Sequence, residues 1–302
     1  MIISPKYDYA MKELFQNKVV LRFFIGDVLG IPQDRICFIH LNNTFLRKRF
    51  QRQKLGILDL VVELNSSIKI NIELQVKVFE GWEKRQLFYL SKLYVEELAA
   101  GESYDHLRKT IGISILNFNL SERKAYHSVY RLRDEDGEEF SDILEIHILE
   151  LNKKLTGQGE IDNWIRFFNA EKEEDFKMIK TNNPGIQEAI REMKRMSLNN
   201  PLRLRYEAYL KRVRDEQARE MYVEKKGRAE GRAEGRAEGR AEFILELLEM
   251  KGSVPEELQK RIRSERNTDQ LRQWFRLAVK SKSVREFQEQ LQEQLQQQLQ
   301  QK

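Results

Sequence analysis

The stretch LDLVVELNSSIKINIELQV, residues 58–76, decides the fold of this chain. Two runs of aliphatic and β-branched residues flank the turn formers Asn65, Ser66 and Ser67, and this pattern is typical of a β-hairpin. In the second run apolar and polar residues alternate strictly, so that the apolar side chains point to one face of the sheet and the polar side chains to the other. The stretch therefore predicts two antiparallel strands.

The predicted register places two carboxylates side by side. If residues 65–67 form the loop, counting outward sets Asp59 opposite Glu73. The apolar positions then match as well, with Leu60 opposite Ile72. Like charges directly opposite each other destabilise a sheet, so the pair needs an explanation.

Two explanations of the carboxylate pair are open at this point. In the first, a divalent cation lies between Asp59 and Glu73, and hard oxygen ligands of this kind suit Mg²⁺ or Mn²⁺. Gln75, two residues along the same face, then orients an attacking water through its amide. In the second, the strands form a solvent-exposed edge where Glu63 pairs with Lys69 and the acids are incidental.

Composition narrows the class of protein. The chain has 302 residues, 40% of them hydrophobic and 33% charged, which indicates one medium domain with a smaller domain or a helical extension. No apolar run approaches the roughly 18 residues of a membrane span. The N-terminus has no basic segment followed by an apolar stretch, so no membrane association and a cytoplasmic location are expected. Cys37 is the only cysteine and the four histidines are scattered, which argues against a disulfide or a structural zinc site.

A basic segment leads directly into the strand that carries Asp59. The formal net charge of +5 is modest for this length, so local charge has to indicate any nucleic-acid partner. The segment RKRFQRQK, residues 47–54, contains basic residues and no acid. Beside a metal site such a patch would hold a DNA backbone through phosphate contacts, although charge runs are often only solvated. The candidate DNA-binding residues here are Arg47, Lys48, Arg49, Arg52 and Lys54.

The remaining patterns indicate a mixed α/β (α+β) core followed by helices. Apolar periodicity predicts one helix over 8–29 and another over 79–100. Strands are expected at 36–50, 110–118, 125–132 and 143–150, and only helices after residue 161. Residues 227–242 repeat GRAE, which as an isolated helix would be weak because each glycine costs about 1 kcal/mol. This repeat is either a charged spacer or a close-packing stripe for a dimer. Two or three short helices and a glutamine-rich end follow.

At the hairpin the sequence resembles the PD-(D/E)XK nuclease fold, and more closely the Rpn family of recombination-promoting nucleases, also described as transposases. The resemblance rests on YDYAMKELF near the start, LDLVVEL and INIELQV in the hairpin, and the following EKRQLFYLSKLYVEELAAGESYDHL and IGISILNF. The GRAE tract and the helical C-terminal region also look like this family. Residues 1 to about 150 are covered well, and the remainder more in layout than in motif.

The resemblance implies a central mixed sheet flanked by helices and a divalent-metal-dependent DNA endonuclease. Asp59 and Glu73 would be the metal carboxylates, and the backbone carbonyl of Leu74 a further ligand. Gln75 stands where the superfamily usually has lysine, which implies a variant mechanism, because glutamine carries no positive charge. Asp8 is either a further acid near the metal or the cap of the helix that follows it. Arg85, with Tyr89 four residues further on, matches a family position and either binds phosphate or holds the active-site acids.

These inferences combine into one expected organisation. Residues 1–200 would form the nuclease domain, 201–242 a charged helical linker and 243–302 a small helical region that serves association, with a homodimer able to cut both strands. The expected cofactor is Mg²⁺ or Mn²⁺, the partner DNA, and the role recombination, mobile elements or defence. Two alternatives remain. One is a catalytically weak or inactive DNA-binding or dimerising regulator with the nuclease fold, and the other a transposase-type strand-transfer enzyme, for which no helix-turn-helix or zinc module is visible.

Overall fold

The chain folds into two compact units, Met1–Ala208 and Tyr209–Lys302. The structure is a computed structural model that describes residues 2–42, 45–46, 56–57, 59–96, 98–99, 101–157 and 159–300. The division expected at residues 200 and 242 stays a prediction. Of the helices that the structure describes, none has the length and apolarity that a membrane span requires.

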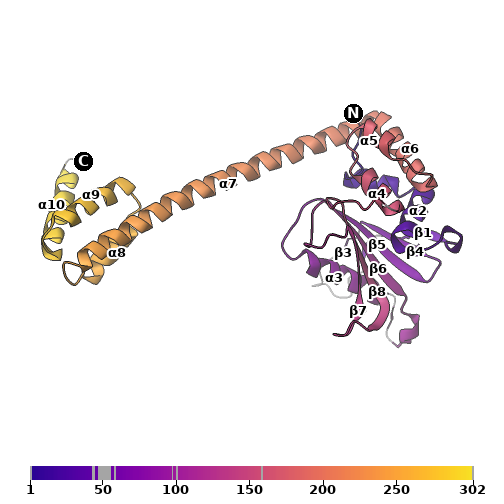
Figure 1. Ribbon diagram of the computed structural model, residues 1–302, viewed down its shortest axis with the longest axis horizontal. Helices are drawn as coiled ribbons and strands as arrows, with labels where there is room; N and C mark the ends of the chain where they lie inside the picture. Colours follow the sequence, from indigo (N-terminus) through magenta and orange to yellow (C-terminus); the bar gives the residue numbers. More distant parts are fainter. Residues whose placement is uncertain are drawn as a thin grey trace. The chain divides into compact units, whose positions relative to one another are not determined.

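A six-stranded mixed sheet forms the centre of the first unit, with the strand order β1-β4-β5-β6-β8-β7 (Figure 1). Strands β5 and β6 pair in parallel, as do β6 and β8, and the remaining neighbours are antiparallel. The mixed α/β architecture predicted from the sequence is confirmed. The strands of this sheet are β1 (Ile39–Asn42), β4 (Leu60–Leu64), β5 (Ile68–Gln75), β6 (Lys109–Leu116), β7 (His127–Arg133) and β8 (Glu139–Glu150), and a separate pair consists of β2 (Phe45–Leu46) and β3 (Gly56–Ile57).

The hairpin of β4 and β5 has the predicted register. Leu64 pairs with Ile68, and Leu60 with Ile72. Asn65 adopts the left-handed conformation at φ 51°, which a turn of this kind requires and asparagine tolerates. Its side-chain oxygen accepts hydrogen bonds from the backbone N–H groups of Cys37 at 2.8 Å and Phe38 at 3.0 Å. The turn is thereby tied to the chain that enters β1.

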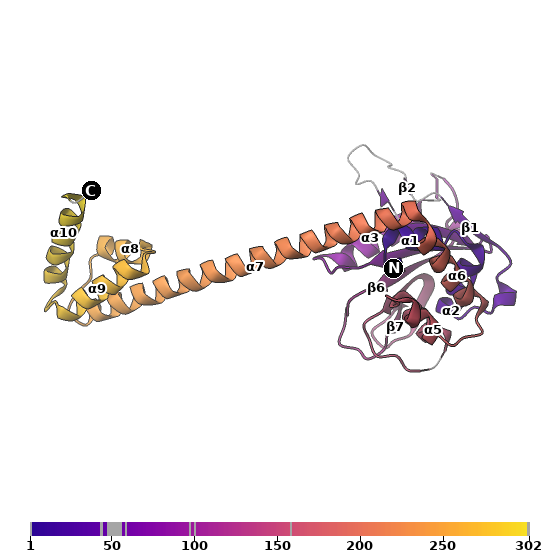
Figure 2. The same ribbon diagram turned by 90° about the horizontal axis from the view of Figure 1, so that it is seen from above.

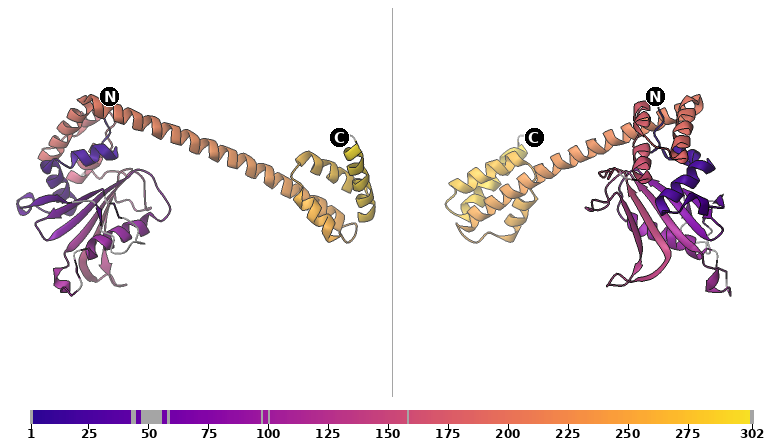
Figure 3. Two further views of the ribbon diagram at one scale, coloured as in Figure 1. Left: turned by 180° about the vertical axis from the view of Figure 1, so that it is seen from behind. Right: turned by 45° about the vertical axis from the view of Figure 1, so that its right-hand side comes forward.

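Both faces of the central strands are buried. Helix α3 (Trp82–Val95) lies against the face that carries Glu73, because Trp82 clusters with Leu116 and Ile148, and Tyr89 with Val61. On the opposite face Ile70 and Ile72 of β5 and the isoleucines of β6 are also buried. Figure 3 shows the sheet with its surrounding helices from two further sides. The other helices of this unit are α1 (Asp8–Leu14), α2 (Lys18–Leu29), α4 (Glu160–Phe168), α5 (Glu173–Met178) and α6 (Pro184–Leu198), with short 3-10 turns η1 (Gln33–Arg35) and η2 (Tyr104–His106).

The single helix predicted over residues 8–29 was wrong, because the chain forms two helices there. Helix α1 ends at Leu14, and Asn17 begins a new helix as its N-cap. The side-chain oxygen of Asn17 accepts hydrogen bonds from the N–H groups of Val19 at 3.0 Å and Val20 at 3.4 Å. The apolar periodicity continues across this break, which is why the pattern alone does not reveal it. The predicted end at residue 29 is confirmed, because α2 ends at Leu29 and Gly30 follows as its C-cap with φ 68°.

Replacing Asn17 by alanine should lower stability through the loss of this cap. Without its side-chain oxygen, two N–H groups at the start of α2 lose their acceptor, and such a loss typically costs about 1 kcal/mol. Urea denaturation followed by circular dichroism measures the change. Asn17→Ser, which keeps a capping oxygen, should recover most of it, and an alanine variant as stable as wild type would contradict the assignment of the cap.

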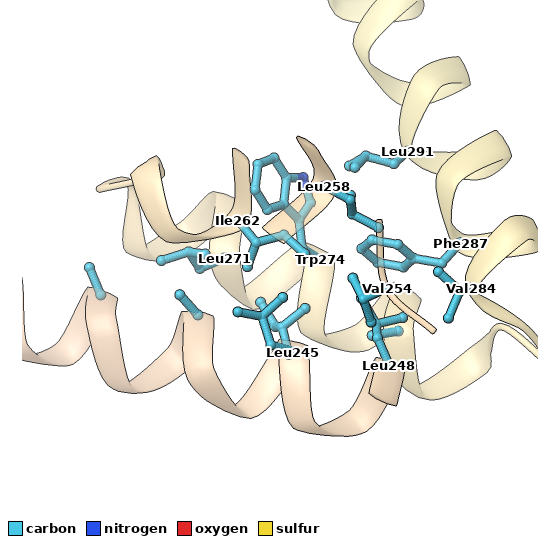
Figure 4. Packing of buried hydrophobic residues seen from close by; sticks show 14 residues of the cluster. Leu245, Leu248, Val254, Leu258, Ile262, Leu271, Trp274, Val284, Phe287 and Leu291 are labelled. Carbon is cyan, nitrogen blue, oxygen red and sulfur yellow. The ribbon is translucent and has the colours of Figure 1, made fainter. Parts of the chain in front are cut away.

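The second unit is built on one hydrophobic cluster, which Figure 4 shows at close range. Trp274 lies within it and is 2% exposed. Ala237 and Ala241, from the last two GRAE repeats, belong to the same cluster. The repeat therefore does not stand alone as a helix, since tertiary packing supports its end. The helices are α7 (Asn200–Glu249), which begins in the first unit, and then α8 (Glu256–Ser264), α9 (Thr268–Lys280) and α10 (Val284–Gln300), seen from above in Figure 2.

Candidate active site

The two carboxylates of the hairpin lie next to each other in the interior of the sheet. Asp59 directly precedes β4. Because Leu60 pairs with Ile72, the next residue outward on each strand places Asp59 opposite Glu73 in β5. Strand β5 has a neighbour on each side, and the Glu73 side chain is only 6% exposed. That of Asp59 is 25% exposed. The alternative of a solvent-exposed strand edge is therefore wrong, although Glu63 does face Lys69.

Burial makes the negative charge of both acids costly. It raises the pKa of Asp59, and the nearby Asp8 adds to the rise while Lys12 opposes it. Burial likewise raises the pKa of Glu73, against the lowering effects of Gln86 and Arg85. The charge of Asp59 raises the pKa of Glu73 further. The pair is therefore costly to keep ionised unless positive charge lies beside it.

Glu73 is held by two side chains of α3. Arg85 Nη2 lies 2.9 Å from Glu73 Oε1, and Gln86 Nε2 donates to Glu73 Oε2 at 2.5 Å. The Ser114 hydroxyl in β6 donates to the side-chain oxygen Oε1 of Gln86 at 3.4 Å, and this contact orients the Gln86 amide. The Arg85 guanidinium lies over the ring of Tyr89, 5.4 Å from its centroid. Arg85 thus binds Glu73 and Tyr89 packs against its guanidinium, while its contact with a phosphate stays a prediction.

Asp59 is held from the other side by Lys12 of α1. Lys12 Nζ lies 3.0 Å from Asp59 Oδ1 and 3.0 Å from Asp8 Oδ2. Burial alone would lower the pKa of the Lys12 ammonium, but the two carboxylates outweigh burial and raise it. Asp8 is the first residue of α1 rather than its N-cap, which is Tyr7, and no side chain caps this helix. Asp8 therefore approaches Asp59 through a shared lysine.

The other predicted residues differ in what they contact. The amide of Gln75 donates to the backbone carbonyl of Lys77 at 2.9 Å. The backbone of Leu74 opposes the rise in the pKa of Asp59, and the carbonyl of Leu74 as a metal ligand stays a prediction. Five candidate DNA contacts lie outside the described residues: Arg47, Lys48, Arg49, Arg52 and Lys54.

The donor set fits a small divalent cation. Mg²⁺ is typically bound by one or two carboxylates together with several waters, and Asp59 with Glu73 supplies such a pair. Within the described residues no three His, Cys, Asp or Glu side chains converge as a ready-made metal cage. Lys12 and Arg85 supply the positive charge that balances the pair. A cation would have to share this site with the Lys12 ammonium.

Sequence reasoning missed Gln86, and it noted Lys12, like Asp8, only as part of the N-terminal helix motif that resembles the family. Gln86 interrupts the apolar stripe that Trp82, Leu90 and Leu93 form on α3, and a polar residue on such a stripe signals a buried partner. Lys12 gave a weaker signal, because only the three-dimensional fold brings α1 to Asp59.

The raised pKa of Asp59 predicts how stability depends on pH without added metal. Because the folded pKa exceeds the unfolded one, the stability that Asp59 contributes is present below the unfolded pKa and is lost as pH rises through the folded pKa. Asparagine stays uncharged, so the melting temperature of Asp59→Asn should be no lower than that of wild type at neutral pH. In acid Asp59 is protonated in wild type too, so any gain in melting temperature should vanish there. Asp142, whose pKa is lowered by Lys109, is the opposite case. Asp142→Asn should melt slightly lower at neutral pH, and thermal melts across pH compare the variants. If Asp59→Asn instead melts well below wild type, the carboxylate is stabilising and this account of its burial is wrong.

Comparison with known proteins gives one match. A family model described as PD-(D/E)XK nuclease family transposase matches residues 5–222. No curated protein matches the chain, and no solved structure does.

Proposed function

Since the chain belongs to the PD-(D/E)XK nuclease family transposases, we propose that it is a divalent-metal-dependent DNA endonuclease. The observation that carries the proposal is the pair formed by the buried Glu73 and the partly buried Asp59, side by side on the central hairpin. A fold retains such a pair at a cost in stability, and a site for a cation accounts for that cost. The match to the nuclease family supports the same chemistry.

Asp59 and Glu73 would hold Mg²⁺ or Mn²⁺, with the carbonyl of Leu74 as a further ligand. When bound, the cation supplies charge stabilisation at the phosphate and a lower pKa for a bound water. Gln86 and Arg85 fix the two oxygens of Glu73, so that this carboxylate is positioned before substrate arrives. Gln75 would orient the attacking water through its amide, which requires the amide to leave the Lys77 carbonyl.

Basic residues would bind the DNA phosphates. The segment that contains Arg47, Lys48, Arg49, Arg52 and Lys54 leads to Asp59 in the sequence, and phosphate contacts of this kind weaken steeply with salt. Arg85 is 40% exposed while it binds Glu73, so one side of the guanidinium remains available to a phosphate. A homodimer formed through the second unit would allow cuts in both strands.

The test is cleavage of supercoiled plasmid by the purified full chain at low salt, in Mg²⁺, in Mn²⁺ and in EDTA. We expect nicked or linear DNA in the metals and none in EDTA. The products should carry 5′-phosphate and 3′-hydroxyl ends, which DNA ligase can reseal. A chain that shifts plasmid on a gel yet leaves it intact in every metal would favour the DNA-binding regulator instead.

Strand transfer is a second candidate, because the matching family is described as transposases. The same carboxylates would then activate a 3′-hydroxyl of DNA in place of water. Adding a labelled oligonucleotide duplex to the plasmid reaction distinguishes the two. Labelled plasmid would indicate strand transfer, and unlabelled cut plasmid would indicate hydrolysis.

A further inference from the structure

The hairpin motif that contains Asp59, Glu73 and Gln75 has no lysine at its last position, yet a lysine from another element lies beside the two carboxylates. Gln75 stands where the superfamily usually has lysine, and a glutamine amide carries no charge. Its amide nitrogen donates to the Lys77 carbonyl at 2.9 Å. No charge therefore reaches the carboxylates from this position.

The Lys12 ammonium reaches the same carboxylates from another element. It lies 3.0 Å from Asp59 Oδ1, and it is placed there by α1, whose residues Met11 and Leu14 are fully buried. The Lys12 side chain is 37% exposed, so it contacts both the site and the solvent from which a substrate arrives. Lysine is a compact charge on a flexible stem, which allows it to change partners.

The other cation of the site is less suited to this role. Arg85 is bound to Glu73 at 2.9 Å, and its guanidinium lies 5.3 Å from the ring centroid of Phe79 and 5.4 Å from that of Tyr89. Its Nε is buried and has no hydrogen-bond partner among the described residues. These contacts hold Arg85 in place, whereas Lys12 can move to a phosphate and leave Asp59 to a cation.

We propose that Lys12 supplies from α1 the positive charge that the superfamily takes from a lysine at the position of Gln75. The inference rests on the proposed nuclease function. In hydrolysis the water oxygen bonds to phosphorus, the bond from phosphorus to O3′ breaks, the water proton passes to solvent and O3′ takes a proton from solvent. Lys12 keeps its protons throughout and donates hydrogen bonds to a non-bridging phosphate oxygen, where negative charge builds up.

The assignment is tested by removing the lysine at position 12 and introducing one at position 75. Lys12→Met should lower kcat for plasmid cleavage by about 10²- to 10³-fold with little change in KM, the loss expected for one donor to a developing negative charge. Lys12→Met combined with Gln75→Lys should recover at least about tenfold, or ~1.4 kcal/mol of transition-state stabilisation. Lys18→Met removes an exposed lysine of α2 and should cleave like wild type. Cleavage by Lys12→Met within about twofold of wild type, or no recovery in the double variant, would overturn the assignment.

Binding of Mn²⁺ provides a readout that is independent of cleavage. Lys12→Met removes the ammonium that shares Asp59 with the cation, so it should bind Mn²⁺ at least as tightly as wild type, as measured by electron paramagnetic resonance of free Mn²⁺. Loss of Mn²⁺ binding together with a lower melting temperature would show that Lys12 is structural and overturn the inference. Failure of the proposed function looks different, because wild type itself would then leave plasmid uncut in every metal.

Discussion

Asp59→Asn should abolish metal-dependent cleavage while the fold is kept. Asparagine has nearly the shape of aspartate but removes one of the two charges that would hold a cation. Charge stabilisation by a bound cation is worth several kcal/mol, and at ~1.4 kcal/mol per tenfold the loss is expected to reach about 10³-fold or more. Initial rates of plasmid nicking in Mg²⁺ and in Mn²⁺ measure it.

The same variant separates catalysis from binding and folding. Burial raises the pKa of Asp59, so an uncharged residue there should be accommodated without loss of stability. DNA retention on a gel in Ca²⁺ should persist, because phosphate contacts come from basic residues. The matched control is Asp142→Asn, an acid of β8 that pairs with Lys109 at 2.8 Å and should cleave like wild type. Cleavage by Asp59→Asn at the wild-type rate would exclude Asp59 from the reaction.

Trp274→Ala should unfold the second unit and leave the first intact. Trp274 is 2% exposed and lies in the cluster with Leu245, Leu258 and Phe287 (Figure 4). Truncating a buried tryptophan to alanine typically costs about 3–5 kcal/mol. A small domain has a total stability of only about 5 kcal/mol or somewhat more, so most of it would be lost. In the part of the chain that the structure describes, the buried Trp274 Nε1 atom has no hydrogen-bond partner, and its removal offsets a little of this cost.

Amide hydrogen exchange read by mass spectrometry of the full chain measures this effect region by region. In Trp274→Ala, protection should fall across α8, α9 and α10 and persist in β5 and β6. Phe275→Ala is the matched control, because Phe275 is the next residue of the same helix but is 39% exposed. If α8 to α10 stay protected in Trp274→Ala, the cluster does not hold this unit together.

The hairpin was predictable because its chemistry is local. Strict alternation along β5 and the turn at Asn65 determine the register, and the structure has the register that they predict. The strands after residue 109 could be predicted for the same reason, including the turn at Gly137, where φ is 87°. The family resemblance added an expectation that periodicity alone does not give, namely that the two acids hold a metal ion in a nuclease.

The features that the sequence did not predict depend on contacts between residues that are far apart in the chain. The break at Asn17 rests on a cap that apolar periodicity does not reveal, and Asn17 Nδ2 also donates to Glu188 of α6 at 3.1 Å. The contact of Lys12 with Asp59 likewise joins two elements that are far apart in the sequence. The burial of Glu73 follows from the position of β5 inside the sheet, which depends on β6, a strand that comes later in the chain.

A divalent cation between Asp59 and Glu73 is what the proposed function requires. Crystals of the full chain soaked in Mn²⁺, with an anomalous difference map at the manganese edge, detect such a cation. We expect a peak in contact with both carboxylates in wild type and its loss in Asp59→Asn. Saturating Mn²⁺ that leaves this position empty, in crystals of a protein that cleaves DNA in Mn²⁺, would show that the cation does not bind there.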